Sequence, residues 1–279
     1  MIKIGNYNAL KVVKKVDFGF YVDGEEYGEI LMPAKYAPDD LAIDDIVKVF
    51  VYRDSEDRLV ATTERPFIEV GEVGLLRAKS VGSIGAFMEW GVLKDLLVPF
   101  REQAVPIEEG RSYVVYAYLD NVTKRIVGST KLNKYIGNKA PRYNVGDEVQ
   151  TVVAKQTDLG YKVVVDNLFW GMIFKNDIFD DIRVGDRIPA YVKLVRDDGK
   201  IDLQLRSSGG DRVFQLARRI SGYLADKDGR MTITDSSAPE EIKATFQCSK
   251  KDFKKALGLL YKRGQVLLKE GEVVLVKKK

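Results

Sequence analysis

The sequence predicts a mainly β protein, in which three small five-stranded barrels precede an α+β domain at the C-terminal end. The first observation is a set of short motifs that recurs three times within residues 1–208. The second is their richness in Val, Ile, Tyr and Phe, which favour pleated, half-buried positions. The third is a change to helical spacing after residue 208. A length of 279 residues also exceeds the ~150 typical of one domain.

The first recurring motif has a glycine at its centre. It occurs at 17–22, 83–88 and 158–163, and its glycines are Gly19, Gly85 and Gly160. The glycines are 66 and then 75 residues apart. A glycine inside a strand usually marks a bulge or a sharp bend. We therefore expect one strongly bent strand in each repeat.

Two further motifs follow the glycine motif in the same order. One occurs at 44–51, 110–117 and 185–192, and the other at 58–62, 125–129 and 200–204. In the first repeat Val47, Val49 and Val51 alternate with other residues, as in a strand. About five curved strands in ~70 residues favour a closed barrel of the oligonucleotide-binding (OB) type. We place the three barrels at 1–65, 66–137 and 138–208.

Residues 209–279 have the element order of a winged helix. Helical spacing begins at Asp211, and two capping boxes begin at Ser237 and Ser249, the second ahead of a helix that ends near Gly264. Strands at 266–268 and 273–276 then form a hairpin, and Thr232–Thr234 would supply a short strand after the first helix. The predicted fold is thus three OB-type barrels followed by a winged-helix domain.

Composition excludes several classes of site. The chain has no histidine and one cysteine, Cys248, so no His-based triad, His-containing metal site or intrachain disulfide exists. We expect no enzyme activity, no cofactor and no metal. A nuclease would need converging carboxylates, whereas the adjacent aspartates of this chain point to opposite faces of a strand.

Charge is distributed unevenly along the chain. Residues 209–279 contain 16 basic and 9 acidic residues, a net charge of +7, whereas residues 1–65 have a net charge of −4. A compact basic unit is typical of a surface that binds phosphates. A solvated face that keeps the protein soluble has the same composition.

Specific motifs resemble a known family. The segment 17–23 resembles the strand signature of S1 RNA-binding domains, and Gly171–Phe174 resembles the segment that follows it. Three S1-like units before a winged helix are similar to the conserved virulence factor B family of bacterial RNA-binding regulators. Segments 96–103, 236–242 and 249–255 are typical of that family. The resemblance covers essentially the whole chain.

The resemblance implies that each barrel binds single-stranded RNA through two strand aromatics and one following aromatic residue or histidine. The matching positions are Phe18, Tyr21 and about Met32; Ile84, Phe87 and about Val98; and Leu159, Lys162 and Phe174. Repeat two keeps one aromatic, and repeat three has Tyr161, Phe169, Trp170 and Lys175 close by. The candidate nucleic-acid-binding residues of the barrels are Phe18, Tyr21, Phe87, Tyr161, Lys162, Phe174 and Lys175. Phe20 and Tyr116 are expected in the core.

The last predicted helix adds basic candidates. Lys250, Lys251, Lys254 and Lys255 lie on or near one face of it. Lysine lacks the fork geometry that reads guanine edges, so contact with the backbone is the expected mode. An ordinary solvated helix face is the alternative.

These observations predict a cytoplasmic, non-enzymatic regulator that binds single-stranded RNA. One alternative is a scaffold that docks on a protein of the gene-expression machinery, such as a ribosomal protein or a polymerase subunit. Another is a DNA-binding protein that uses its winged helix. No membrane segment and no signal peptide are expected.

Overall fold

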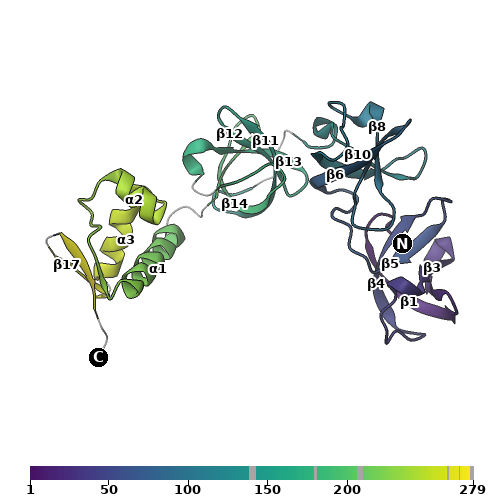
Figure 1. Cartoon of the computed structure of the whole chain (residues 1–279), viewed down its shortest axis with the longest axis horizontal. Coiled ribbons are helices and arrows are strands. Elements are labelled where there is room, and N and C mark those ends of the chain that lie inside the picture. The colour runs from purple at the N-terminus through teal and green to yellow at the C-terminus, as the bar shows by residue number, and fades with distance from the viewer. Residues whose placement is uncertain (138–142, 179–180, 206–209, 263, 270, 277–279) are drawn as a thin grey trace.

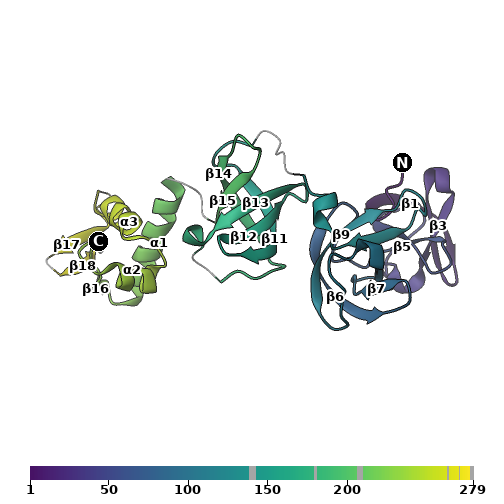
Figure 2. The same cartoon turned by 90° about the horizontal axis from the view of Figure 1, so that it is seen from above.

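The computed structural model describes residues 1–137, 143–178, 181–205, 210–262, 264–269 and 271–276. Three β units and a helical C-terminal unit follow one another along the molecule (Figures 1 and 2). The order is that predicted from the motifs. None of the described helices is both long and apolar enough to span a membrane.

The first unit is a closed five-stranded barrel. Its strands are β1 (Tyr7–Val16), β2 (Gly19–Asp23), β3 (Glu29–Pro33), β4 (Ile46–Arg53) and β5 (Leu59–Thr62), with 3-10 turns at Glu25–Tyr27 and Ala34–Tyr36. They pair in the order β1-β2-β3-β5-β4. Parallel pairing of β3 with β5 closes the barrel around buried residues such as Val22 and Met32.

The second unit has the same strand order but is nearly closed. It consists of β6 (Val73–Val81), β7 (Gly85–Met88), β8 (Leu96–Pro99), β9 (Ser112–Leu119) and β10 (Ile126–Ser129), with 3-10 turns at Phe100–Glu102 and Leu132–Lys134. Within the described residues β8 and β10 form the two ends of the sheet. They still lie side by side, and side chains of β8 pack over Gly128 of β10.

The third unit is again a closed barrel. Its strands are β11 (Glu148–Thr157), β12 (Gly160–Val165), β13 (Phe169–Phe174), β14 (Arg187–Val195) and β15 (Ile201–Gln204), with a 3-10 turn at Lys175–Asp177. Val163, Ile173 and Leu203 are fully buried at its centre. Each of the three motifs found in the sequence therefore occupies the same strands in all three units.

The repeated glycine has a different position from the one expected. Gly19, Gly85 and Gly160 are each the first residue of the second strand, directly after a tight turn. A β-carbon there would lie 2.3, 2.3 and 2.1 Å from the carbonyl oxygens of the adjacent third strand. The bulge lies in the preceding strand of each barrel, where the pairing register shifts. Close backbone approach is therefore what requires glycine.

The C-terminal unit is a winged helix. It contains α1 (Gly210–Asp226), β16 (Arg230–Met231), α2 (Pro239–Phe246), α3 (Lys250–Lys262), β17 (Val266–Lys269) and β18 (Glu272–Leu275). The three helices bury Ile220, Ile242 and Phe253 against a sheet of order β16-β18-β17. The short strand precedes the predicted Thr232–Thr234, because Arg230 and Met231 are the residues that pair with β18.

The capping predictions differ in outcome. Ser249 Oγ accepts a hydrogen bond from the Asp252 amide at 3.2 Å, so the cap of α3 is confirmed. The capping box at Ser237 is wrong, because α2 starts after Ala238 and has no side-chain cap. Ser237 Oγ instead accepts a hydrogen bond from the Thr234 amide at 3.1 Å and closes the turn before α2.

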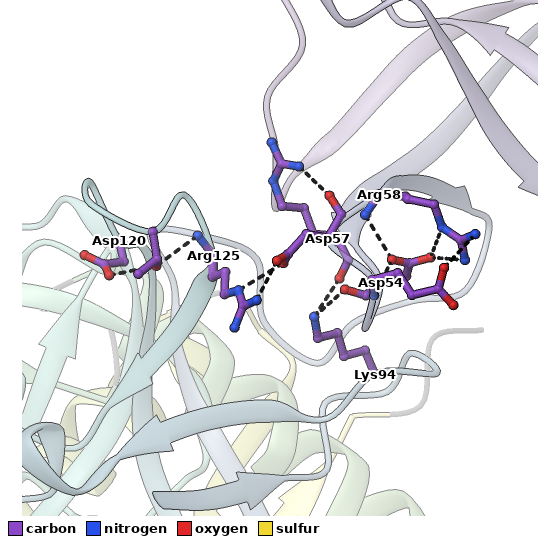
Figure 3. A network of polar contacts seen from close by, with 9 residues as sticks. Asp54, Asp57, Arg58, Lys94, Asp120 and Arg125 are labelled. Atoms are coloured by element: carbon purple, nitrogen blue, oxygen red, sulfur yellow. Dashed lines mark hydrogen bonds and ion pairs between the residues drawn. The ribbon is translucent and has the colours of Figure 1, made fainter. Parts of the chain in front are cut away.

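A shared hydrophobic cluster, distinct from the core of barrel one, joins the first two barrels. Phe50 and Tyr52 of β4 pack in the same buried cluster as Trp90 and Leu96 of the second unit. The rings of Phe50 and Trp90 meet edge to face, with centroids 5.4 Å apart. A polar network that includes Arg125, Asp57 and Lys94 connects the two units beside this core (Figure 3).

A second, smaller cluster joins barrels two and three. Val73, Val114 and Ile136 pack in it with Val164 and Trp170. A one-residue bridge between Gly137 and Phe169 adds two backbone hydrogen bonds, Gly137 N to Leu168 O at 2.8 Å and Trp170 N to Gly137 O at 3.0 Å. Burial and backbone pairing together fix this junction.

Candidate nucleic-acid interface

The three barrels present an apolar side chain at the same turn. Phe18, Ile84 and Leu159 each precede the repeated glycine, and they are 60, 57 and 64 % exposed. The turn places the residue outside the barrel because its neighbours pair the first and second strands. Each of the three barrels therefore exposes a large apolar side chain at this turn, although burying that side chain would stabilise the fold. This repeated exposure makes the turn a candidate contact for a ligand.

A second shared position lies two residues after the glycine. Tyr21, Phe87 and Lys162 occupy it, and all three are half-buried. Their cross-strand partners from the first strand are Lys14, Ser80 and Lys155. In barrel one the Lys14 ammonium lies 5.4 Å from the centroid of the Tyr21 ring. In barrels one and two, this position is therefore aromatic, and its cross-strand neighbour is a lysine or a serine. In barrel three, both residues are lysines.

The third expected position is shifted by one residue in two barrels. Strand pairing sets Phe174 opposite Gly160, and it sets Pro33 and Pro99 opposite the equivalent glycines. Met32 and Val98, expected at this position, are fully buried. That expectation was wrong because a one-residue shift along a strand moves a side chain to the opposite face. Phe174 is half-exposed beside the turn, as expected.

The core assignments follow the same alternation. Phe20, one residue after its glycine, is 7 % exposed and lies in the core of barrel one, as predicted. Tyr161 has the equivalent position in barrel three and packs against the core of barrel three. It therefore lies apart from the outward face to which the sequence assigned it. Tyr116, also expected in the core, is only half-buried. It packs against the cluster that joins barrels two and three, and its ring stacks on Tyr135 with centroids 4.6 Å apart.

An exposed aromatic residue beside the turn of barrel two was missed by the sequence analysis. Phe100 is 52 % exposed, and its amide donates a hydrogen bond to Ile84 O at 3.4 Å. The exposed Lys175 has the equivalent place in barrel three, with its amide bonded to Leu159 O at 3.0 Å. Comparing the strand motifs alone hides Phe100, because it lies in the 3-10 turn that follows β8. Phe100 nevertheless lies in segment 96–103, which the sequence analysis gave as typical of the conserved virulence factor B family.

Barrel three carries an apolar pocket of about 300 Å³ on this face. Its lining includes Leu159, Lys162, Trp170, Phe174 and Arg196. The Arg196 guanidinium lies 5.7 Å from the centroid of the Phe174 ring, and its Nε donates a hydrogen bond to Asp202 at 3.0 Å. An aromatic ring and a guanidinium plane at one pocket are the groups on which a nucleobase stacks. Trp170 was noted in the sequence beside Gly171–Phe174 but was not made a candidate, and Arg196 was missed because it is distant from the motifs in sequence.

Lys162 of barrel three lies over an aromatic ring and has a perturbed pKa. Its ammonium lies 3.7 Å from the centroid of the Trp170 ring. Partial burial, and secondarily the nearby Lys155, lower the pKa of the Lys162 amino group below its ordinary value. An anion bound at this position would offset both effects.

The four candidate lysines of α3 divide into two pairs. Lys250 Nζ donates a hydrogen bond to Ser237 O at 2.9 Å, and Lys254 Nζ lies 3.5 Å from an Asp235 carboxylate oxygen. This pair packs against the turn before α2. Lys251 and Lys255 are exposed on the same helix and are the cations available to a ligand.

The described residues contain no cluster of three or more His, Cys, Asp or Glu side chains placed to hold a metal ion. The aromatic rings, the guanidinium of Arg196 and the lysines gathered on these faces offer stacking, hydrogen-bond donation and attraction of negative charge.

Comparison with known families identifies two parts of the chain. Residues 4–64 match the S1 domain family, and residues 218–275 match the CvfB-like winged helix domain family. The first match covers barrel one, and the second covers most of the winged helix. These two domain types indicate a protein that binds nucleic acid.

Relatives align along nearly the whole chain. A Bacillus subtilis protein named uncharacterized protein YitL is 28 % identical over 96 % of this chain and 92 % of its own. Conserved virulence factor B of Staphylococcus saprophyticus is 22 % identical over 86 % of this chain and 83 % of its own.

Among solved structures, a Streptococcus pneumoniae multidomain protein with nucleic acid binding domains is 23 % identical. The alignment covers 98 % of both chains with a TM-score of 0.40. Together, the winged-helix match, the S1 match and the relatives that align along most of the chain support the conserved virulence factor B family for this chain.

Proposed function

We propose that this protein is a non-enzymatic, cytoplasmic regulator that holds single-stranded RNA and acts after transcription. The observation that carries the proposal is the apolar residue exposed at the same turn of all three barrels. Phe18, Ile84 and Leu159 are each more than half exposed. A site repeated along the molecule suits a flexible polymer better than a compact ligand.

The physical basis of binding is stacking on these turns. A base stacked on an aromatic side chain contributes about 1–3 kcal/mol regardless of its sequence, because every base has a π-face. Phe18, Tyr21, Phe87, Phe100 and Phe174 supply such rings on the three barrels. We therefore infer weak sequence preference and a requirement for unpaired bases.

The winged helix adds an electrostatic contribution to the same proposal. Lys251 and Lys255 are exposed on α3, whereas Lys250 and Lys254 contact the turn before α2. Contacts between lysine and phosphate release counterions, so the affinity falls with added salt. The domain would strengthen binding of any strand that the barrels hold.

The test is fluorescence anisotropy with a labelled 15-nucleotide single-stranded RNA, a duplex RNA and a duplex DNA at two salt concentrations. We expect tight, salt-sensitive binding to the single strand alone. Preference for duplex DNA would instead make the winged helix the main site and favour a role in transcription. Absence of binding to all three would overturn the proposal.

A matched pair of variants tests the stacking mechanism. Phe18→Ala removes the exposed ring at the turn, and Phe67→Ala removes a ring that is 56 % exposed in the linker between barrels one and two. We expect Phe18→Ala to weaken RNA binding about 5- to 150-fold, as the loss of one stacked base implies. Equal effects of the two variants would exclude stacking at the turn.

The regulatory part of the proposal has its own test. RNAs crosslinked to the protein in cells should change in half-life or translation when Phe18→Ala replaces the wild-type chain. Unchanged half-life and translation of every crosslinked RNA would contradict a regulatory role and leave RNA binding standing.

A further inference from the structure

A groove of about 920 Å³ runs between barrels two and three. We call it the inter-barrel groove. Barrel two contributes Thr130, Lys131 and Lys134 to it, and barrel three contributes Lys155, Lys162 and Trp170. Its base is the packed junction described above, so both walls have a fixed separation. In Figure 1, β13, which carries Trp170, lies toward barrel two.

The charge of the groove has one sign. Four lysines line it, and no carboxylate is among the described lining residues. Lys134 forms an ion pair of 2.7 Å with Glu102, and Lys131 Nζ donates a hydrogen bond to Arg101 O at 2.7 Å. Lys155 and Lys162 are therefore the cations whose charge is least compensated.

Lys155 and Lys162 are moreover direct cross-strand partners in the pairing of β11 with β12. Like charges placed opposite one another destabilise a sheet. The equivalent pairs in barrels one and two are Lys14 with Tyr21 and Ser80 with Phe87, so the double lysine is particular to barrel three. A ligand that carries negative charge would relieve the repulsion.

Trp170 provides an independent indication. Its side chain is 8 % exposed, and the described residues offer no hydrogen-bond partner to its indole Nε1–H. An indole N–H is a donor only, and a buried donor without a partner costs about 1–3 kcal/mol. By contrast, Nε1 of Trp90 donates to Ile68 O at 2.7 Å. The groove is thus lined by ammonium groups and by a residue whose buried donor is unsatisfied, and both features suit a ligand rich in acceptor oxygens.

We propose that the inter-barrel groove binds the phosphodiester backbone of a single strand that continues from the pocket of barrel three, so that barrels two and three form one composite site. This inference rests on the proposed function, because it assigns a path to the same strand. Lys162 and Trp170 line both the pocket and the groove, which makes the two continuous. Bases stack at Phe174 and Arg196, and phosphates follow the lysines.

The experiment compares oligonucleotide lengths in the full-length protein. A 5-nucleotide RNA probes the face of one barrel, and a 15-nucleotide RNA is long enough to enter the groove as well. The test variant is Lys131→Ala with Lys155→Ala, and its matched control is Lys48→Ala with Lys3→Ala in barrel one. Lys162 and Lys134 are left intact because they contact Trp170 and Glu102.

We expect the test variant to bind the 15-nucleotide RNA at least ten-fold more weakly and the 5-nucleotide RNA as tightly as wild type. The slope of log affinity against log salt should fall in magnitude by about 1.4, since each phosphate contact to a single strand contributes about 0.7. A DNA strand of 15 nucleotides should lose the same factor, because phosphate contacts do not involve the 2′-hydroxyl. Loss confined to one sugar would overturn backbone binding.

A second variant removes the indole donor and keeps an aromatic ring at the same position. Trp170→Phe retains a buried ring without the indole N–H, and we expect a few-fold loss for the 15-nucleotide RNA. If wild type binds both RNAs and the lysine variant matches its control, the groove is excluded while the proposed function stands. If wild type binds neither RNA, both proposals fail.

Discussion

The guanidinium of Arg125 donates two hydrogen bonds to the carboxylate of Asp57 (Figure 3). Nε donates to Oδ1 at 2.9 Å, and Nη2 donates to Oδ2 at 2.5 Å. Arg125 precedes β10 of barrel two, and Asp57 lies in the turn between β4 and β5 of barrel one. Lys94 Nζ donates to two carbonyl oxygens of the same turn, at 3.0 and 2.8 Å. The side chains of Arg125 and Asp57 are 53 and 46 % exposed.

The first prediction separates this ion pair from the core beside it. Arg125→Ala should lower the free energy of unfolding by less than about 1 kcal/mol, because exposed pairs are screened by water and salt. Phe50→Ala should lower it by about 3–5 kcal/mol, because Phe50 is fully buried in the core shared by barrels one and two. Chemical denaturation followed by tryptophan fluorescence measures both. A larger effect for Arg125→Ala would contradict this order.

The second prediction concerns the repeated glycine. Gly160→Ala would place a β-carbon 2.1 Å from Ile173 O, so β12 and β13 would have to separate. Gly146→Ala is the control, since Gly146 also has a positive φ but has nothing within 4 Å of the added carbon. The control should cost about 1 kcal/mol of backbone strain. Gly160→Ala should cost clearly more in thermal melts, and equal melting temperatures would refute a close-approach role.

The third prediction is a pH dependence at Glu102. Burial raises the pKa of this carboxyl, but hydrogen bonds from Lys134 and Ser129 outweigh it and hold the pKa below its ordinary value. A lowered pKa in the folded state stabilises the protein above the unfolded pKa, and this contribution is lost as the pH falls through the folded value. Glu102→Gln should therefore be destabilising by about 1–3 kcal/mol at pH 7.

The difference between wild type and Glu102→Gln should shrink as the pH falls through the acid range where the carboxyl becomes protonated. Melting temperatures of the two proteins at several pH values between 7 and 3 measure it. A constant difference across that range would show that the charge of Glu102 does not contribute.

The fourth prediction distinguishes the lysines of α3. Lys251→Ala with Lys255→Ala should weaken binding of a 15-nucleotide RNA and reduce the salt slope by up to about 1.4, because each lost phosphate contact removes about 0.7. Lys250→Ala with Lys254→Ala removes the same charge from residues that contact the turn before α2. We expect this second pair to lower stability more and the salt slope less. The reverse pattern would assign the ligand to the other face of α3.

The fifth prediction tests barrel two. Phe100→Ala should weaken RNA binding several-fold, because it removes an exposed ring from a residue whose amide is bonded to the turn that carries Ile84. Val122→Ala is a control, since Val122 is 89 % exposed in the turn between β9 and β10. Equal anisotropy titrations of the two variants would remove barrel two from the binding surface.

Local sequence carried much of the fold. The glycine motif, the alternating valines of β4 and the cap at Ser249 depend on interactions within a few residues, so they could be read directly. The errors also have local causes. Met32 and Val98 were misassigned because side chains alternate between faces of a strand, and only the pairing with β2 and β7 fixes the register. The cap at Ser237 failed because Ser237 bonds to Thr234 instead.

By itself, the sequence determined the three repeats, the winged helix and the exposed turn residue Phe18, because these follow from periodicity and from motifs whose residues are neighbours in the chain. Only the tertiary structure decided which lysines line the inter-barrel groove. Lys155 and Lys162 meet through strand pairing, and Trp170 joins them from β13 at the junction of two barrels. Contacts between distant segments depend on packing and register, and no local pattern encodes them.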